Sequence, residues 1–304
     1  MQLRHLELFI AVAEERHFTR AAERENIVQS GISSAIRSLE DELGTALFLR
    51  NTRRVELSAT GQLFLPEARR ILSTVLSAKA AVAGVHQNLR GRLSIGTIDG
   101  LTPFLDLPQL LRTFNVAHPY VKLIVQGSHM SSLFEGLRDG SLDMVFIVIP
   151  EALPSALSHD ELSNSPMVLV HSGQHRFARL KSCTLAEAIK EKFIDFSPRW
   201  GTRHLVDEMF AVEGLEREVD YEVESYDLVS QFVSRDFGVS ILPEPIARSR
   251  NLPFTQIRSS KRGINLPSWR LGLFRMRNSS GLPSNPPADE FRKRVLDHFE
   301  QLDF

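Results

Sequence analysis

Apolar residues recur with the period of an α-helix over the first part of the chain. An amphipathic helix is predicted at the N-terminus from steps of three and four between Leu3, Leu6, Phe9, Ile10 and Ala13. Two shorter helices are predicted between Phe18 and Glu40, and we expect the Thr19 hydroxyl to cap the first of them. The second is expected to bury three residues spaced by four and three, namely Ile32, Ile36 and Leu39.

The opposite face of the second helix carries short polar side chains and one long cation: Gln29, Ser30, Ser33, Ser34 and Arg37. Such groups suit contacts with base edges and phosphates, as on the recognition helix of a helix-turn-helix protein. A solvated face on an ordinary helix would show the same pattern. The segment that follows favours the first interpretation.

A short β-hairpin is predicted after this helix, which we expect to end at Gly44. Val55 and Leu57 alternate with charged residues. Two strands joined through Asn51 and Thr52 would place three arginines beside a duplex backbone, namely Arg50, Arg53 and Arg54. Residues 1–58 are therefore predicted to form a winged helix-turn-helix domain.

Residues 59–88 are predicted to form one long helix with a heptad seam. Its apolar residues advance by alternating steps of four and three: Phe64, Ala68, Ile71, Val75, Ala78, Val82 and Val85. Pairing with a second copy would let two recognition helices read two half-sites. We therefore expect a dimer held by Phe64, Ile71, Val75 and Val82. The seam could instead pack on the second domain of the same chain.

The rest of the chain alternates predicted strands and helices after a hinge expected at residues 89–91. A βαβαβ series has strands at 93–96, 121–127 and 142–149 and helices at 104–117 and 132–138. Its nearly continuous apolar strands predict a parallel sheet that is covered on both faces. A second series runs from residue 167 to 257, and a strand at 268–276 and a helix at 288–302 close the chain.

Composition places the chain among globular proteins. Its 304 residues suggest two or three units, and 42% hydrophobic with 24% charged residues permits buried cores. No run of about 18 apolar residues occurs, so we expect no membrane contact and a cytoplasmic protein. Cys183 is the only cysteine, which excludes an internal disulfide and a cysteine-based metal cluster and predicts a small buried or half-buried side chain.

Bulk charge does not support DNA binding. Residues 1–58 contain eight Arg, no Lys and nine Asp or Glu, so their net charge is −1, which is also the net charge of the whole chain. Support for DNA binding therefore has to come from the way the charges are distributed along this segment. The three wing arginines cluster, whereas Glu14, Glu15 and residues 40–42 fall at helix ends, from where they can face away from DNA.

Residues 1–65 resemble the N-terminal domain of the LysR-type transcriptional regulators. The resemblance is carried by Leu6, Phe9, Ala13, Phe18, Thr19, Ala21, Ala22, Gln29, Ser33, Ile36, Leu39 and Glu40, then by LG at 43–44, LFLR at 47–50 and LSATG at 57–61. It implies DNA binding through the helix that holds Gln29, Ser33 and Arg37, with Arg53 on the wing.

The chain departs from the family pattern at three positions of this helix. The family usually has Ser, Pro and a basic or long polar residue where this chain has Val28, Ser30 and Ser34. Val28 has no oxygen to cap a helix, so we expect Asn26 or Ser30 to do so. Ser34 reaches less far toward bases, which affects the operator sequence but not the act of binding.

The resemblance also implies a two-lobed α/β effector domain similar to periplasmic binding proteins. Lobe I is expected at 92–161 and 267–304, and lobe II at 162–266. Ligands collect beyond the carboxyl ends of strands in such sheets, and the family places its effector pocket there. Candidate effector contacts are Thr97, Asp99, Gly100, Thr102, Ser128, His129, Ser197, Trp200, Thr202, Arg203 and Val239.

Asp99 stands where the family most often has Ser or Thr. A carboxylate there would repel an acidic effector unless Arg199, Arg203 or His129 neutralises it. We therefore expect an effector with a donor or amino group as well as an acidic one. Asp99 could instead only cap the helix that follows.

These observations predict an α plus α/β protein that acts as a sequence-specific DNA-binding transcriptional regulator under the control of a small-molecule effector. Expected partners are double-stranded operator DNA, RNA polymerase, the effector and further copies of the chain in a homodimer or homotetramer. Candidate DNA contacts are Thr19, Gln29, Ser30, Ser33, Ser34, Arg37, Arg50, Arg53 and Arg54. The alternative is a ligand-independent architectural DNA-binding protein that uses its α/β domain only for oligomerisation.

An enzyme is not expected. The sequence has no G-x-S-x-G elbow, H-E-x-x-H motif, Walker loop or G-x-G-x-x-G motif. Accordingly, no catalytic residue, metal site or cofactor is predicted.

Overall fold

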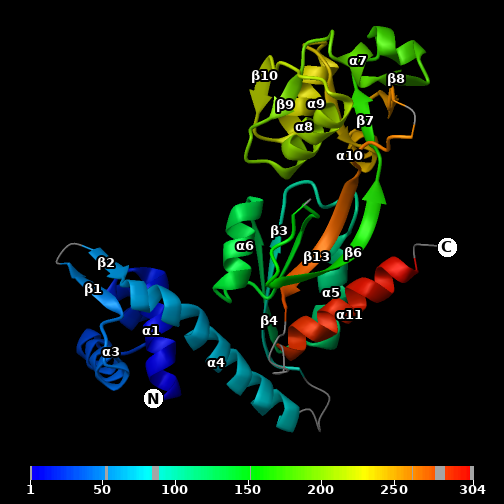
Figure 1. The fold of residues 1–304 in the computed structure, drawn as a ribbon. Helices are drawn as coiled ribbons and strands as arrows, with labels where there is room; N and C mark the ends of the chain where they lie inside the picture. The colour runs from blue at the N-terminus through cyan, green and yellow to red at the C-terminus, as the bar shows by residue number, and fades with distance from the viewer. Residues whose placement is uncertain are drawn as a thin grey trace.

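The computed structural model describes residues 2–51, 54–83, 89–150, 152–261, 263–277 and 285–301. The chain forms a helical N-terminal domain with a β-hairpin, a long helix, and two α/β lobes (Figure 1). The predicted combination of an α domain with an α/β domain is confirmed. In these ranges no helix has both the length and the apolar character needed to cross a membrane.

The N-terminal domain contains α1 (Leu3–Glu15), α2 (Phe18–Arg24), α3 (Gln29–Leu43), β1 (Phe48–Asn51) and β2 (Arg54–Leu57). β1 and β2 pair antiparallel, so the predicted wing hairpin is confirmed. A single apolar cluster joins the helices and the hairpin and includes Leu6, Phe9, Ile32, Ile36, Leu39 and Phe48. The three inward-facing residues predicted for α3 therefore lie in the core.

The helix caps differ from those expected. His17 caps α2, because its Nδ1 accepts hydrogen bonds from the backbone N–H groups of Thr19 and Arg20, so the prediction that Thr19 caps this helix is wrong. Val28 occupies the N-cap position of α3 without a side-chain cap, and neither Asn26 nor Ser30 replaces it. The end of α3 at Gly44, which has a left-handed φ of 70°, is as predicted.

The long helix α4 (Ala59–Ala83) packs its first half on the N-terminal domain of its own chain. Ala68 is fully buried in that domain's core, and Phe64 and Ile71 pack against it. This part of the heptad seam therefore packs partly within the chain, while Phe64 and Ile71 remain half-buried and not fully covered. Val75 is half-buried, and the side chain of Val82 lies outside the described residues.

Lobe I contains a five-stranded sheet in the order β4 (Val121–Gly127), β3 (Gly91–Thr97), β5 (Met144–Val148), β13 (Trp269–Met276) and β6 (Leu157–Ser165). α6 (Met130–Arg138) covers one face, and α5 (Leu107–Ala117) and α11 (Pro286–Glu300) cover the other (Figure 1). The prediction of two covered faces is confirmed. The parallel sheet predicted from the βαβαβ series is confirmed, because β3 pairs in parallel with both β4 and β5. β13, for which no direction was predicted, joins this sheet antiparallel to β5 and β6.

Lobe II contains a mixed sheet in the order β11 (Ser240–Pro243), β7 (Met167–Val170), β12 (Phe254–Arg258) and β8 (Ser182–Thr184). The parallel pair β9 (Ile194–Phe196) and β10 (Tyr221–Val223) adjoins it through a bridge between Phe193 and Val239. The helical segments of the lobe are η2 (Arg176–Arg179), α7 (Leu185–Ala188), α8 (Gly201–Glu213), α9 (Tyr226–Ser234) and α10 (Glu244–Ser249). Cys183 is buried as predicted, and desolvation raises the pKa of its thiol to about 11.

Two segments connect the lobes. β6 leads into β7 through Pro166, and the chain returns from β12 in lobe II to β13 in lobe I (Figure 1). The boundary expected between residues 161 and 162 lies inside β6, whose pairing with β13 continues to Ser165. Lobe I therefore extends to Ser165. Gly91, which was expected in the hinge, is the first residue of β3.

Candidate functional site

The two faces of α3 differ as the sequence predicts. Ile32, Ile36 and Leu39 are buried against the other helices, whereas Gln29, Ser30, Ser34 and Arg37 are exposed and Ser33 is half-buried. The Gln29 amide Nε2 lies 3.3 Å from Ser33 Oγ, so these two side chains sit together at the start of the helix. This arrangement leaves a polar face that is free of protein contacts with the core.

Glu40 on α3 fixes the position of the wing. Its carboxylate Oε1 accepts hydrogen bonds from the backbone N–H groups of Leu47 at 2.7 Å and Phe48 at 3.3 Å. Arg53 lies outside the described residues, as do the side chains of Arg50 and Arg54. Thr19 is exposed at the start of α2.

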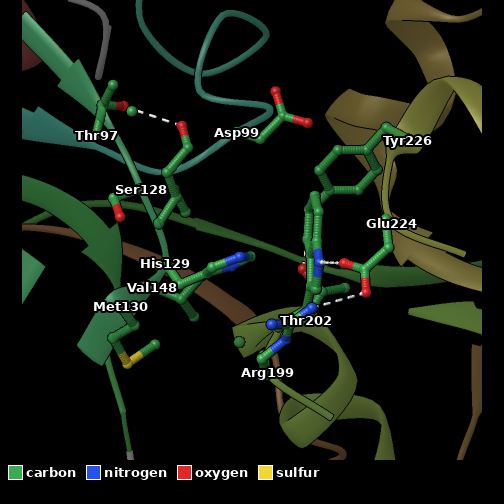
Figure 2. A pocket seen from close by; sticks show the side chains of 14 residues that line it. Thr97, Asp99, Ser128, His129, Met130, Val148, Arg199, Thr202, Glu224 and Tyr226 are labelled. Atoms are coloured by element: carbon green, nitrogen blue, oxygen red, sulfur yellow. Dashed lines mark hydrogen bonds and ion pairs between the residues drawn. The ribbon is translucent and has the colours of Figure 1, made fainter. Parts of the chain in front are cut away.

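A cavity of about 390 Å³ lies between the two lobes, at the carboxyl ends of strands and the N-terminal ends of α6 and α8. It is lined from lobe I by Thr97, Ile98, Asp99, Gly127, Ser128, His129, Met130 and Val148, and from lobe II by Arg199, Trp200, Gly201, Thr202, Glu224 and Tyr226. Figure 2 shows Asp99 and His129 on the lobe I side of the cavity and Glu224 and Tyr226 on the lobe II side.

The two carboxylates of the cavity have different environments. Glu224 accepts hydrogen bonds from Trp200 Nε1 and from the Arg199 guanidinium, each at 3.1 Å, and these bonds lower the pKa of its carboxyl. Asp99 is exposed to the cavity, and its Oδ1 accepts a hydrogen bond from the backbone N–H of Gly100. Glu224 is therefore neutralised by a cation, whereas the contacts described for Asp99 include none.

A buried aromatic group forms the floor of the cavity on the lobe II side. Trp200 stacks on Phe196 with ring centroids 4.4 Å apart, and Tyr226 packs edge-on against both rings. The Tyr226 hydroxyl lies 2.8 Å from Thr202 Oγ1. Burial strongly raises the pKa of Tyr226, so its hydroxyl remains protonated at neutral pH.

Two glycines bring the lobes into contact beside the cavity. A Cβ on Gly100, whose φ is +79°, would lie 2.5 Å from Cε2 of Tyr226. A Cβ on Gly201 would lie 2.9 Å from the terminal methyl carbon of Met130. Lobe I and lobe II therefore touch at the ends of α6 and α8, where little space remains.

Six predicted effector contacts line the cavity, namely Thr97, Asp99, Ser128, His129, Trp200 and Thr202. Five others do not: Gly100, Thr102, Ser197, Arg203 and Val239. Arg203 instead pairs with Asp207 one helical turn later, at 2.9 Å, and donates to the carbonyl of Phe196. Asp99 does not cap a helix, because α5 begins later and is capped by Asp106.

Glu224, which follows β10, and Tyr226, the first residue of α9, line the cavity but were not predicted from the sequence. The rule that ligands collect beyond the carboxyl ends of strands applies to β10 as well, so this signal was present in the sequence. The other lining residues that were not named among the candidate contacts are Ile98, Gly127, Met130, Val148, Arg199 and Gly201.

A winged helix with a free polar face, joined in one chain to two lobes around a cavity, defines the class of ligand-responsive DNA-binding regulators. Comparison with known families agrees. A family model described as "Bacterial regulatory helix-turn-helix protein, lysR family" matches residues 3–62, and one described as "LysR substrate binding domain" matches residues 86–299. The chain belongs to the LysR family of transcriptional regulators.

Individual relatives support the assignment. The chain is 36% identical over 254 residues to the uncharacterized HTH-type transcriptional regulator YnfL of Escherichia coli K12, and the match covers 82% of this chain and 84% of the relative. A full-length OxyR variant from Pseudomonas aeruginosa has a similar fold, with a TM-score of 0.77 at 22% identity over 99% of this chain and 95% of that chain. Full-length CbnR in complex with its target DNA has a TM-score of 0.55 at 24% identity over 98% and 100%.

The predicted function is thereby confirmed at the level of the family. The chain is a DNA-binding transcriptional regulator with an effector-binding domain. A ligand-independent architectural role is not favoured, because the α/β part matches a substrate-binding domain.

Proposed function

We propose that Gln29, Ser33 and Arg37 contact base edges and phosphates of the operator. The observation that supports this proposal is that the polar face of α3 is exposed while its apolar face is buried. Arg37 suits a guanine or a phosphate, and Gln29 suits an adenine. The remaining candidates then contact the DNA backbone around the helix and wing: Thr19, Ser30, Ser34, Arg50, Arg53 and Arg54.

Operator binding by three variants tests this assignment. The probe is a duplex selected by the protein from a random library, compared with a scrambled duplex over a salt series. Gln29→Ala should cost about 1–3 kcal/mol on the selected duplex only, whereas Arg53→Ala should weaken both duplexes and reduce the salt slope by about one.

The control is Gln231→Ala, the same change at an exposed helical position on α9 of lobe II. It should leave both affinities unchanged. Equal losses on the selected and scrambled duplexes for Gln29→Ala would contradict base reading by this residue.

The effector that fits the cavity carries an amino group and an acidic group. Asp99 offers a carboxylate without a described cationic partner, and the Trp200 and Tyr226 rings beside it favour a cation as well. The acidic group finds backbone N–H groups at the starts of α6 and α8, which both face the cavity. Glu224 does not compete for the amino group, because Arg199 already pairs with it.

Calorimetric titration with amino acids and with the matching acids that lack the amino group tests this ligand class. For an amino acid that binds, Asp99→Asn should weaken affinity about tenfold or more, since the negative charge that pairs with the amino group is lost. The matched control is Asp227→Asn, an exposed carboxylate of α9 outside the cavity. Unchanged affinity and selectivity in Asp99→Asn would refute the role of this carboxylate.

The chain acts as a homodimer or homotetramer in this account. The contacts between copies are made along the heptad seam, by the half-buried Phe64 and Ile71 and by Val75 and Val82 after them. A cytoplasmic location, contact with RNA polymerase and the lack of catalytic activity remain part of the proposal.

A further inference from the structure

One arginine joins the DNA-binding domain, the linker helix and lobe I. Arg69 on α4 has only 10% of its side chain exposed. Its Nη2 lies 2.9 Å from Glu14 Oε1 on α1, and its Nη1 lies 3.0 Å from Asp139 Oδ2 at the end of α6. The same Nη1 donates to the backbone carbonyl of Asp139 at 3.1 Å. Arg69 is therefore held from both sides by carboxylates of different domains.

The contact continues into the helix-turn-helix. Glu14 also accepts a hydrogen bond from Arg24 of α2 at 2.8 Å. The chain of charges Arg24, Glu14, Arg69 and Asp139 thus runs from α2 to lobe I without a gap. α2 precedes the recognition helix α3, so lobe I is tied to the part of the domain that orients α3.

The backbone at the end of α6 is shaped to meet α4. Gly140 has a φ of +68°, which favours glycine, and a Cβ there would lie 3.5 Å from Cβ of Arg69. Asp139 Oδ1 accepts a hydrogen bond from the backbone N–H of Ser141, which fixes the carboxylate in this turn. The turn therefore places Asp139 against the linker helix in one conformation.

The other end of α6 lies at the cavity. His129 and Met130 line it, and Met130 meets Gly201 of lobe II across the cleft. α6 has nine residues and spans about 13 Å, so a single helix reaches from the cleft to Arg69. Leu133 and Leu137 are buried against β5 and β13, so the helix moves together with its sheet and does not bend freely.

We propose that α6, through the joint that Asp139 makes with Arg69, transmits the state of the inter-lobe cleft to the DNA-binding domain. This inference rests on the proposed function of the cleft as the effector site. An occupant that separates Met130 from Gly201 shifts α6 at its N-terminal end. The shift then reaches Arg69 and Glu14 at the other end and changes the orientation of α3.

The test introduces a larger side chain into the cleft, where it takes the place of the unknown effector. Gly201→Leu inserts a wedge against Met130, and Gly201→Ala inserts a smaller one that only the flexible Met130 side chain must accommodate. The measured quantity is the affinity for the library-selected duplex. It is measured for each wedge variant alone, for the wedge combined with Asp139→Asn, and for the wedge combined with Glu161→Gln. Asp139→Asn removes the charge but keeps an oxygen for the Ser141 N–H. Glu161→Gln is the matched control, because it breaks a lobe I ion pair with Arg270 away from α6.

We expect the wedge to change operator affinity about fivefold or more, within the usual range for coupled sites. The change should fall below about twofold in the Asp139→Asn background and persist in the Glu161→Gln background. An unchanged affinity in both wedge variants, or an equal change in the Asp139→Asn background, overturns the proposal. Because no effector is used, failure of the amino-group hypothesis leaves this result unaffected.

A distance measurement checks the joint itself. Spin labels on cysteines at Glu23 of α2 and Ser132 of α6, both exposed, report the distance between the two domains when labelled chains are diluted into unlabelled ones. One narrow distance is expected for the parent and for Glu161→Gln, and a broad distribution for Asp139→Asn. A narrow distribution in Asp139→Asn would overturn the joint.

Discussion

At Gly61 the linker helix packs closely against the backbone that precedes β1. A Cβ at this position would lie 2.0 Å from the carbonyl oxygen of Leu47. Ser58 binds both segments here, because its hydroxyl donates to the carbonyl of Ala46 and accepts from the N–H of Gly61. The direction in which α4 leaves the DNA-binding domain therefore depends on the absence of one methyl group.

Gly61→Ala should destabilise the protein by about 1–3 kcal/mol, because backbone atoms have to move. The matched change on α3 is Gly31→Ala, where the nearest atom to the new Cβ is a Val28 methyl at 3.7 Å. There we expect a gain of about 0.5–1 kcal/mol from helix propensity. Scanning calorimetry of the full chain checks both signs, and equal effects would contradict the close approach at Gly61.

Some of the residues that line the cleft could be predicted from the sequence, and others could not. Asp99 and His129 follow strands, so their place at the cavity could be predicted from strand ends alone. Arg203 could not be excluded in this way. Its guanidinium turns to Asp207 on the same helix, and which way a long side chain turns depends on partners that a list of strand ends does not contain.

At the scale of elements, the hydrogen bonds of Glu40 hold the wing in register with α3. Its carboxylate accepts hydrogen bonds from the backbone N–H groups of Leu47, just before β1, and Phe48, the first residue of β1. Leu47 is fully buried, so its N–H depends on a protein acceptor. Glu40 therefore links α3 to the start of the hairpin.

Glu40→Ala should cost about 1–3 kcal/mol of stability, since it leaves a buried N–H without an acceptor. We also expect weaker binding to both selected and scrambled duplexes, because the displaced wing contacts the DNA backbone. Glu40→Gln keeps an acceptor oxygen and should recover most of both losses. Denaturation and DNA titration of the two variants measure this, and equal losses in both would show that the acceptor oxygen is not what matters.

Local pattern predicted most elements of the lobes, and β7 at 167–170 is an example. The local pattern did not predict β6. This strand shows no apolar alternation at its exposed and half-buried positions, which include Ser158, His159, Asp160 and Glu161. This strand forms because it lies at the edge of the sheet and pairs with β13, which is more than 100 residues away in the chain. The antiparallel pairing of β13 with β5 and β6 could not be predicted either, since pairing across such a distance leaves no local signal.

For the whole molecule, the central claim is that the exposed face of α3 is the surface that contacts operator DNA. The proposed roles of the two lobes and of α6 depend on this claim, because both are proposed to act on that surface from a distance. A photo-crosslinking amino acid placed at Ser34, on the exposed face of α3, or at Gln231 of α9 tests this claim directly. Irradiation with the selected duplex should give a covalent protein–DNA product from position 34 and none from position 231, whereas the reverse result would contradict the account.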